Sequence, residues 1–117
     1  SNLIGKPMAL YAINQWAQVH SFWIDWDTEI MKKICQESDY IISSTGVLNL
    51  IDQECISANG KQVVIDIGYA FDEKGKAAGD ANFYEIKDSV HALSPVPGGI
   101  GPLCVYQLFE NIVKLHS

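Results

Sequence analysis

The amino-acid sequence predicts an α/β fold built on a mostly parallel sheet with helices on both faces. Two observations carry this prediction. Segments with apolar residues at helical spacing alternate along the chain with short apolar, β-branched segments. The β-branched segments are also nearly continuous in hydrophobicity, which is typical of strands buried on both faces. Because strands that alternate with helices usually pair in parallel, the predicted architecture is Rossmann-like.

Three segments are expected to be helices. Residues 5–17, "GKPMALYAINQWA", carry apolar side chains at helical spacing and place Pro7 near the helix start. Residues 27–38 gather apolar side chains on one face and begin with acidic residues, which the helix dipole favours there. Residues 101–117 are expected to close the chain as a helix whose inward face includes Leu108, Ile112 and Leu115.

Four segments are expected to be strands, at 19–24, 40–44, 62–68 and 90–95, and the polar residues 72–80 read as a hairpin or surface loop. The hydrophobic strand that should precede the first helix is missing from the sequence. We therefore expect the later part of a longer protein. A sheet lacking that strand would have an unpaired edge, so we expect the isolated chain to be poorly soluble or partly unfolded.

Composition narrows the functional classes. The 117 residues suffice for one domain, with a net charge of −6, eight lysines and no arginine, which disfavours nucleic-acid binding. No apolar run reaches the roughly 18–20 residues of a membrane span, so no membrane partner is expected. The three cysteines form no C-x-x-C pair and the histidines show no metal-ligand spacing. Free thiols and a cytoplasmic location are expected, with no metal.

The first loop and the second strand indicate a dinucleotide site. The stretch "SNLIGKP" could hold a pyrophosphate at a helix N-terminus, or it could simply start a helix. Asp25 follows Gly5 by 20 residues, where an acidic side chain accepts hydrogen bonds from a ribose and repels a 2′-phosphate. The alternative is a helix-capping or solvated carboxylate. The neighbouring Trp23 and Trp26 could stack on adenine or pack against the protein.

Two more loops follow predicted strands. "STG" at 44–46 and "DIGYA" at 66–70 stand at the carboxyl ends of strands, where dinucleotide crevices form in such sheets. Gly46 and Gly68 would let the backbone approach a ligand, or they would only make tight turns. Asp66 lies between apolar residues, which suggests a buried carboxylate with hydrogen-bond partners rather than a catalyst.

The stretch "SPVPGGIGP", residues 94–102, combines three prolines with three glycines. Prolines restrict the backbone and glycines leave it bare, so the stretch predicts a rigid ledge that a planar ligand could contact. The alternative is a stiff lead-in to the last helix. The Val96–Pro97 bond is predicted to be cis.

Together, "SNLIGKPMAL", "VVIDIG", "GKAAGD" and "SPVPGGIGPLCVYQLFEN" resemble, in order, the motifs of the bifunctional methylenetetrahydrofolate dehydrogenase/cyclohydrolase family. The resemblance covers only the carboxyl-terminal coenzyme-binding domain of that family. It implies that residues 1–117 form a partial NAD(P)-binding domain, without the amino-terminal catalytic and folate domain. The intact enzyme would oxidise 5,10-methylenetetrahydrofolate with NAD(P)+ and hydrolyse the methenyl product to 10-formyltetrahydrofolate. A homodimer is also implied.

The resemblance also assigns residues to roles. The family's proton-transferring tyrosine and lysine belong to the amino-terminal domain, so no catalytic residue is expected in this chain. The carboxylate of Asp25 favours NAD slightly over NADP. The coenzyme is expected to contact Ser1, Asn2, Ile4, Gly5, Pro7, Asp25, Thr45, Gly46, Gly68 and Tyr69. The loop over the folate and nicotinamide cleft is expected to contribute Pro97, Gly98, Gly99 and Gly101.

Three positions depart from the family pattern. Tyr69 and Ala70 replace an isoleucine and an asparagine, Leu48 lies where a proline is usual, and Cys104 replaces a threonine. These changes surround the expected coenzyme cleft. They motivate an alternative function, a non-catalytic nucleotide-binding or assembly module derived from the same family.

Overall fold

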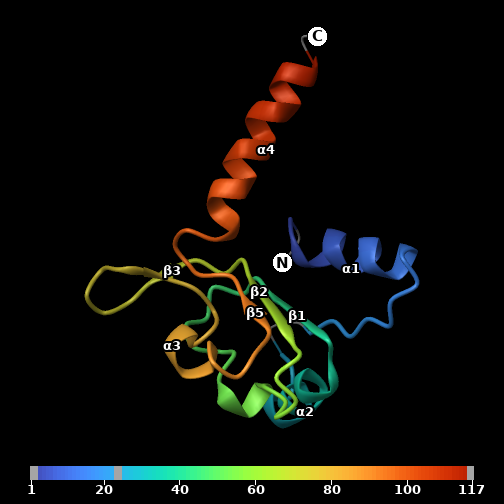
Figure 1. Ribbon diagram of the computed structural model, residues 1–117, viewed down its shortest axis with the longest axis vertical. Helices are drawn as coiled ribbons and strands as arrows, with labels where there is room; N and C mark the ends of the chain where they lie inside the picture. The colour runs from blue at the N-terminus through green and yellow to red at the C-terminus, as the bar shows by residue number, and fades with distance from the viewer. Residues whose placement is uncertain (1–2, 23–24, 116–117) are drawn as a thin grey trace.

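The computed structural model describes residues 3–22 and 25–115, in which a small α/β body carries two projecting helices (Figure 1). The elements follow the order α1 (Gly5–Asn14), α2 (Thr28–Glu37), β1 (Tyr40–Ser43), η1 (Gln53–Cys55), β2 (Val63–Asp66), β3 (Ala70–Phe71), β4 (Ala77–Ala78), α3 (Phe83–Ile86), β5 (Ala92–Leu93) and α4 (Ile100–Leu115). None of these helices is both long and apolar enough to cross a membrane, judged over the described residues.

The main sheet has the order β1-β2-β5 and is parallel throughout. A second, antiparallel pair, β3 and β4, forms the hairpin expected at 72–80. The α/β class and the parallel sheet are therefore confirmed. Two short helical segments, η1 and α3, were not predicted, because three or four residues give no helical periodicity in a sequence.

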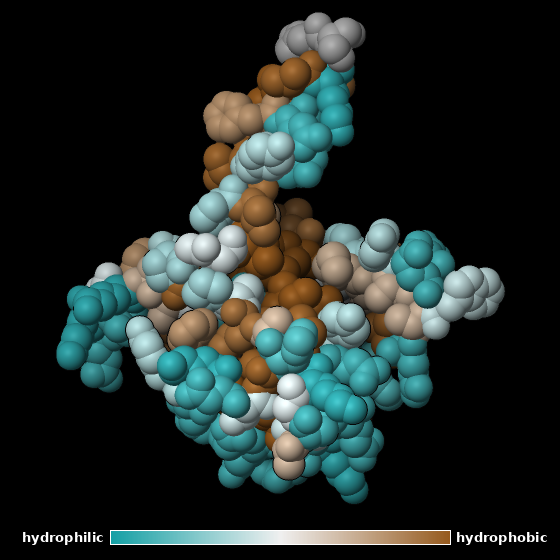
Figure 2. All heavy atoms as spheres, in the orientation of Figure 1, coloured by the Kyte–Doolittle hydropathy of each residue, from teal (hydrophilic) through white to brown (hydrophobic). Residues whose placement is uncertain are grey.

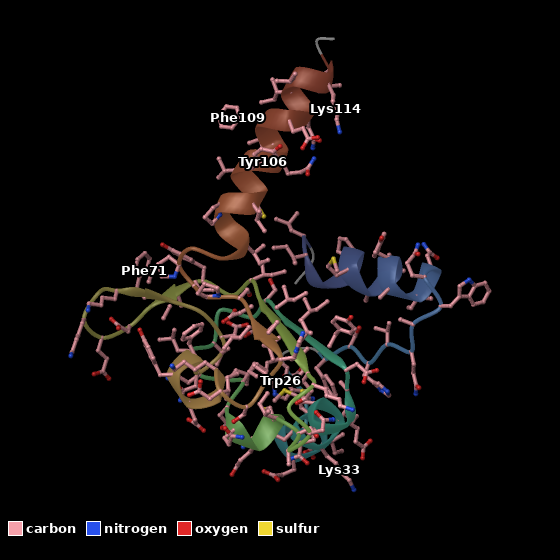
Figure 3. All side chains as sticks on the ribbon, in the orientation of Figure 1. Trp26, Lys33, Phe71, Tyr106, Phe109 and Lys114 are labelled. Carbon is pink, nitrogen blue, oxygen red and sulfur yellow. The ribbon has the colours of Figure 1, made fainter. Side chains whose placement is uncertain are left out.

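The core lies under one face of the sheet, and its buried apolar residues, among those the structure describes, fall between 31 and 86. Met31 and Cys35 of α2 pack with Ile41 of β1 and Val64 of β2, and Ile86 of α3 is fully buried. The carboxylate of Asp27 caps α2 by accepting hydrogen bonds from the backbone N–H groups of residues 29 and 30. Figure 3 shows Trp26 directed into this body, and Trp26 packs against the core as one of the two sequence interpretations proposed.

Burial of β1 differs from the expectation. Ile41 and Ser43 are buried, but Tyr40 and Ile42 on the other face are exposed. The prediction of a strand buried on both faces is therefore wrong for β1, because α2 covers one face and no described element covers Tyr40 and Ile42.

The predicted strand at 19–24 is not formed in its described part. Residues 19–22 are irregular, and residues 23–24 lie outside the described residues. Residues 17–22 and β1 line the same groove, which has a volume of about 1000 Å³. In its described part, the segment 19–24 makes no strand pairing with β1. Within the described chain β1 pairs only with β2, as the expected unpaired edge requires.

The first and last helices form as predicted but pack differently. The first ends at Asn14, three residues earlier than expected, and Trp16 beyond it has a φ of 65°. The last projects away from the body, so the prediction that Leu108, Ile112 and Leu115 face inward is wrong. Neither α1 nor α4 contains a buried residue.

Candidate functional site

Three loops meet at the carboxyl edge of the parallel sheet, because β1, β2 and β5 all end there. Thr45 and Gly46 follow β1, Gly68 and Tyr69 follow β2, and the ledge 94–102 follows β5. The first two loops are in contact range, since a Cβ placed on Gly46 would lie 4.0 Å from the carbonyl oxygen of Tyr69. The structure thus brings together residues that the sequence places more than 20 positions apart.

The carboxylate of Asp80 organises the loop after β1. Asp80 is fully buried, and its Oδ2 accepts hydrogen bonds from Ser43 Oγ (2.6 Å), the Thr45 N–H (2.7 Å) and Thr45 Oγ1 (2.8 Å). Its Oδ1 accepts one from the Gly46 N–H at 2.9 Å. A buried carboxylate requires such partners, and here all four hydrogen bonds come from residues 43–46. The loop is therefore fixed from beneath.

The carboxylate of Asp66, at the end of β2, organises the segment around Asp80. Its Oδ1 accepts from the N–H groups of Gly68 (2.9 Å) and Asp80 (3.1 Å), and its Oδ2 accepts from the Ala81 N–H (2.8 Å). Burial raises the pKa of Asp66, an effect that these backbone hydrogen bonds oppose. Ser94 Oγ, beyond β5, accepts from the Asp66 N–H at 2.8 Å and joins the third strand to this network. The sequence interpretation of Asp66 as a buried carboxylate with partners is confirmed.

Two glycines make room for these carboxylates. A Cβ on Gly68 would lie 1.9 Å from Asp80 Oδ1, and a Cβ on Gly79 would lie 2.1 Å from Asp66 Oδ2. Gly68 is therefore required by the protein's own packing, in addition to any ligand. The sequence offered a close approach of a ligand or a tight turn as the reason for Gly68, and the contact with Asp80 is a third reason that it did not show.

The first turn of α1 faces the same side of the sheet as the loop after β1. Gly5 and Lys6 line the groove of about 1000 Å³, and Ser43 to Thr45 line it from the sheet side. Ile4 immediately precedes the helix, and Pro7 lies in its first turns, as predicted. Ser1 and Asn2, also expected to contact a coenzyme, lie outside the described residues.

The ledge after β5 contains the expected cis peptide bond between Val96 and Pro97. Gly98 has a φ of 99°, which side chains rarely adopt, and a Cβ on Gly99 would lie 2.3 Å from the Pro95 carbonyl oxygen. Gly101, in contrast, has open space where a Cβ would be. Backbone geometry thus accounts for Gly98 and Gly99, whereas only Gly101 is left without a structural reason to be bare.

Two further residues predicted to contact the coenzyme, Asp25 and Tyr69, are exposed. Asp25 is exposed in a turn, and the capping role that the sequence left open belongs to Asp27. Tyr69 is exposed and its ring meets Phe71 edge to face, with centroids 5.5 Å apart. Phe71 belongs to β3 of the hairpin, and Figure 3 shows it away from the core.

Sequence reasoning missed Asp80, Ser43 and Ser94. The available signal was the pair Gly79–Asp80, a glycine directly before a carboxylate at the end of a hairpin, but only the fold shows what the carboxylate binds. Chemically, the edge can bind and orient a ligand through fixed backbone. All three cysteines are free, and the hydrogen bond with Cys55, together with burial, raises the pKa of the Cys35 thiol. Among the described residues, no three potential metal ligands come together.

Comparison with known proteins places this edge in context. The profile of the family described as "Tetrahydrofolate dehydrogenase/cyclohydrolase, NAD(P)-binding domain" matches residues 1–117. The "Bifunctional protein FolD" of Mycoplasma mycoides is 38% identical over 118 residues, which cover 100% of this chain and 40% of that protein. The FolD of Streptococcus thermophilus is 36% identical over 114 residues. The chain therefore spans about 40% of the length of these relatives.

Solved structures of the same kind of enzyme also superpose on this chain. The bifunctional FolD enzyme of Campylobacter jejuni superposes with a TM-score of 0.87 at 34% identity, over 97% of this chain and 39% of that one. The methylenetetrahydrofolate dehydrogenase-cyclohydrolase of Trypanosoma brucei, solved with NADP cofactor and inhibitor, has a TM-score of 0.86 at 28% identity. It too is covered over 39% of its length, and 97% of this chain is matched.

Proposed function

The chain belongs to the tetrahydrofolate dehydrogenase/cyclohydrolase family, as its NAD(P)-binding domain, and on this premise we propose that it binds NAD+ or NADP+ at the carboxyl edge of the β1-β2-β5 sheet. The bound coenzyme serves an enzyme that oxidises 5,10-methylenetetrahydrofolate and hydrolyses the methenyl product to 10-formyltetrahydrofolate. Residues 1–117 act as a partial coenzyme-binding domain, and the proton transfers depend on residues outside this chain.

The observation that carries the proposal is the convergence of three bare or fixed loops at one edge. Gly46 and the carbonyl oxygen of Tyr69 are neighbours, and Gly101 has open space beside it. The first turn of α1 and the end of β1 line one groove, and helix N-termini at such edges suit a pyrophosphate. The residues present therefore fit a dinucleotide.

The division of labour follows from the chemistry. When bound, the nicotinamide ring accepts a hydride from the one-carbon bridge of the folate. The family resemblance places the proton-transferring residues outside this chain, so the share proposed for the described residues is to hold the two reactants in contact and to keep water away. The loop after β1 and the loop after β2 orient the coenzyme, and Pro97, Gly98, Gly99 and Gly101 lie against the folate side.

A modest preference for NAD over NADP is part of the proposal. Asp25 is exposed and is not the cap of α2, so its carboxylate is available to a ribose. A carboxylate accepts hydrogen bonds from two ribose hydroxyls but repels a 2′-phosphate. The T. brucei relative was solved with NADP, which makes this preference a point of difference to measure.

The partners and setting complete the proposal. The substrate is a reduced folate, and a second copy of the chain is the protein partner. Apolar side chains exposed along α4, such as Tyr106 and Phe109, supply surface for association (Figures 2 and 3). The free thiols of Cys35, Cys55 and Cys104 suit a reducing cytoplasm. Sedimentation of the protein as a monomer across a wide concentration range would contradict the dimer.

Calorimetric titration of NAD+ and of NADP+ tests the coenzyme function. Both should bind, NAD+ a few-fold more tightly, and Asp25→Ser should narrow that gap. Asp88→Ser is the matched control, because Asp88 is an exposed carboxylate that pairs only with the neighbouring Lys87 at 3.9 Å among the described ion pairs. Tighter binding of NADP+ would contradict the preference, and no binding of either coenzyme would contradict the function. NADH formation from 5,10-methylenetetrahydrofolate by the natural gene product tests the reaction.

A further inference from the structure

We propose that Asp80 is the positioning residue of the coenzyme loop, and that Asp66 positions Asp80. This inference rests on the proposed coenzyme function and deepens it. Its basis is a chain of two buried carboxylates that connects the end of β2, the end of the hairpin and the loop after β1. Both carboxylates are buried and accept hydrogen bonds from backbone N–H groups, so we infer that they act through the backbone they hold.

The first link is the orientation of Asp80. Three of the hydrogen bonds to Asp66 come from backbone N–H groups, and two of these belong to Asp80 and Ala81. The backbone at this point is fixed further by Ile51, whose N–H donates to the Asp80 carbonyl oxygen at 3.0 Å. Hydrogen bonds thus fix both the N–H group and the carbonyl oxygen of Asp80, and so set the direction in which its carboxylate points.

The second link is the loop itself. Asp80 engages the N–H groups of both Thr45 and Gly46 and the hydroxyl of Thr45. These donors therefore point inward, toward the protein. What the loop can offer a coenzyme is its carbonyl oxygens and the bare backbone of Gly46, which has a φ of 75°. Such a surface suits hydroxyl and amide donors, such as those of a ribose or a carboxamide, rather than a phosphate.

The third link is the spacing of the two loops. The Asp80 carboxyl group occupies the space beside Gly68, where a Cβ would lie 1.9 Å from Oδ1. The same group therefore supports the loop after β1 by hydrogen bonds and the loop after β2 by contact. A change in this one side chain should move both.

The test compares the natural gene product with its Asp80→Asn variant. The amide keeps the size of the carboxylate but must turn an NH₂ group toward at least one of four donors, so the loop loses its fixed position. We expect the Kd for NAD+ to rise about tenfold or more, as loss of a hydrogen bond to a buried charge implies. The amide resonances of Thr45 and Gly46 should also shift, which a merely global loss of stability would not single out.

Two further variants keep the test decisive. Asp72→Asn is the matched control, because Asp72 accepts hydrogen bonds from the N–H groups of Lys74 and Lys76 in the hairpin and should leave the Kd unchanged. Ser43→Ala removes one donor to Asp80 and spares the backbone contacts, so it should raise the Kd by about threefold even where Asp80→Asn does not fold.

The outcomes separate the two ideas. If the natural gene product binds NAD+ and both its Asp80→Asn and its Ser43→Ala variant bind equally well, the positioning role is overturned and the coenzyme function stands. If the natural gene product binds neither coenzyme, the proposed function is overturned and the positioning role with it. Weakened binding together with displaced Thr45 and Gly46 resonances, and no effect of Asp72→Asn, supports the proposal.

Discussion

Apolar side chains are buried in the body of the protein but exposed on its two projecting helices, α1 and α4. In the described body, the buried apolar residues lie between Met31 and Ile86, and the carboxylates beneath the loops are hydrogen-bonded to their neighbours. On α4, apolar side chains such as Leu108 and Phe109 stay exposed along the helix, and none is buried (Figure 2). Helix formation and helix packing are therefore separate. Local sequence specifies where a helix forms, and tertiary contacts decide whether its apolar side chains are buried.

The largest expected effect follows from removing a core side chain. Ile86→Ala should lower the free energy of unfolding by about 2–5 kcal/mol, because it empties fully buried space. Ile112→Ala makes the same chemical change on α4, where the side chain is 43% exposed, and should cost only about 0.5 kcal/mol or less. Urea unfolding of the two variants measures the difference. Equal losses would break the comparison between body and helix.

The next effect concerns glycine. Gly68→Ala should destabilise the body by about 1–3 kcal/mol, because the new methyl group meets the buried Asp80 carboxylate. Gly101→Ala, in the first turn of α4, places its methyl group in open space and should leave stability unchanged or slightly raised. If Gly101 borders the folate side as proposed, Gly101→Ala should still weaken folate binding. An Ala variant at 68 as stable as the natural chain would contradict the packing around Asp80.

The stability of the body should also depend on pH through the buried carboxyl group of Asp66. Burial raises the pKa of Asp66 above its ordinary value of 3.8, so its contribution to stability is complete below that value. The contribution is lost as the pH rises through the higher, folded-state pKa, because the ionised form is buried at a cost. The free energy of unfolding of the natural chain, minus that of Asp66→Asn, should therefore fall as the pH rises from 3.8 through the higher pKa of the folded state. Urea unfolding at a series of pH values measures this difference. A difference that rises with pH over this range would contradict the burial of Asp66.

The smallest effect is expected on the surface of α4. Leu108→Ser replaces an exposed apolar side chain, and the free energy of unfolding should change by no more than about 0.5 kcal/mol. If a second copy covers this helix, as proposed, the same variant should weaken dimerisation in sedimentation experiments. A large loss of stability in the monomer would show that α4 packs against the body.

Much of the fold was predictable because the relevant signals are local. Helical spacing identified α1, α2 and α4, and continuous apolar segments identified β1 and β2. The cis bond before Pro97 also followed from the motif. What the sequence could not show was contact between distant segments: the exposure of Leu108, the irregular backbone at 19–22, and the reach of Asp80 to Thr45 and Gly46. Those depend on which surfaces the chain brings together, and periodicity carries no information about that.

The central claim is that a dinucleotide binds at the carboxyl edge of the parallel sheet. Titration of the isotope-labelled natural gene product with NAD+, followed through the amide resonances of this domain, tests this most directly. We expect saturable shifts at Thr45, Gly46, Gly68 and Tyr69 and in the ledge before α4, with none at the hairpin turn near Lys74. An absence of saturable shifts, or shifts confined to the hairpin or to α2, would contradict it.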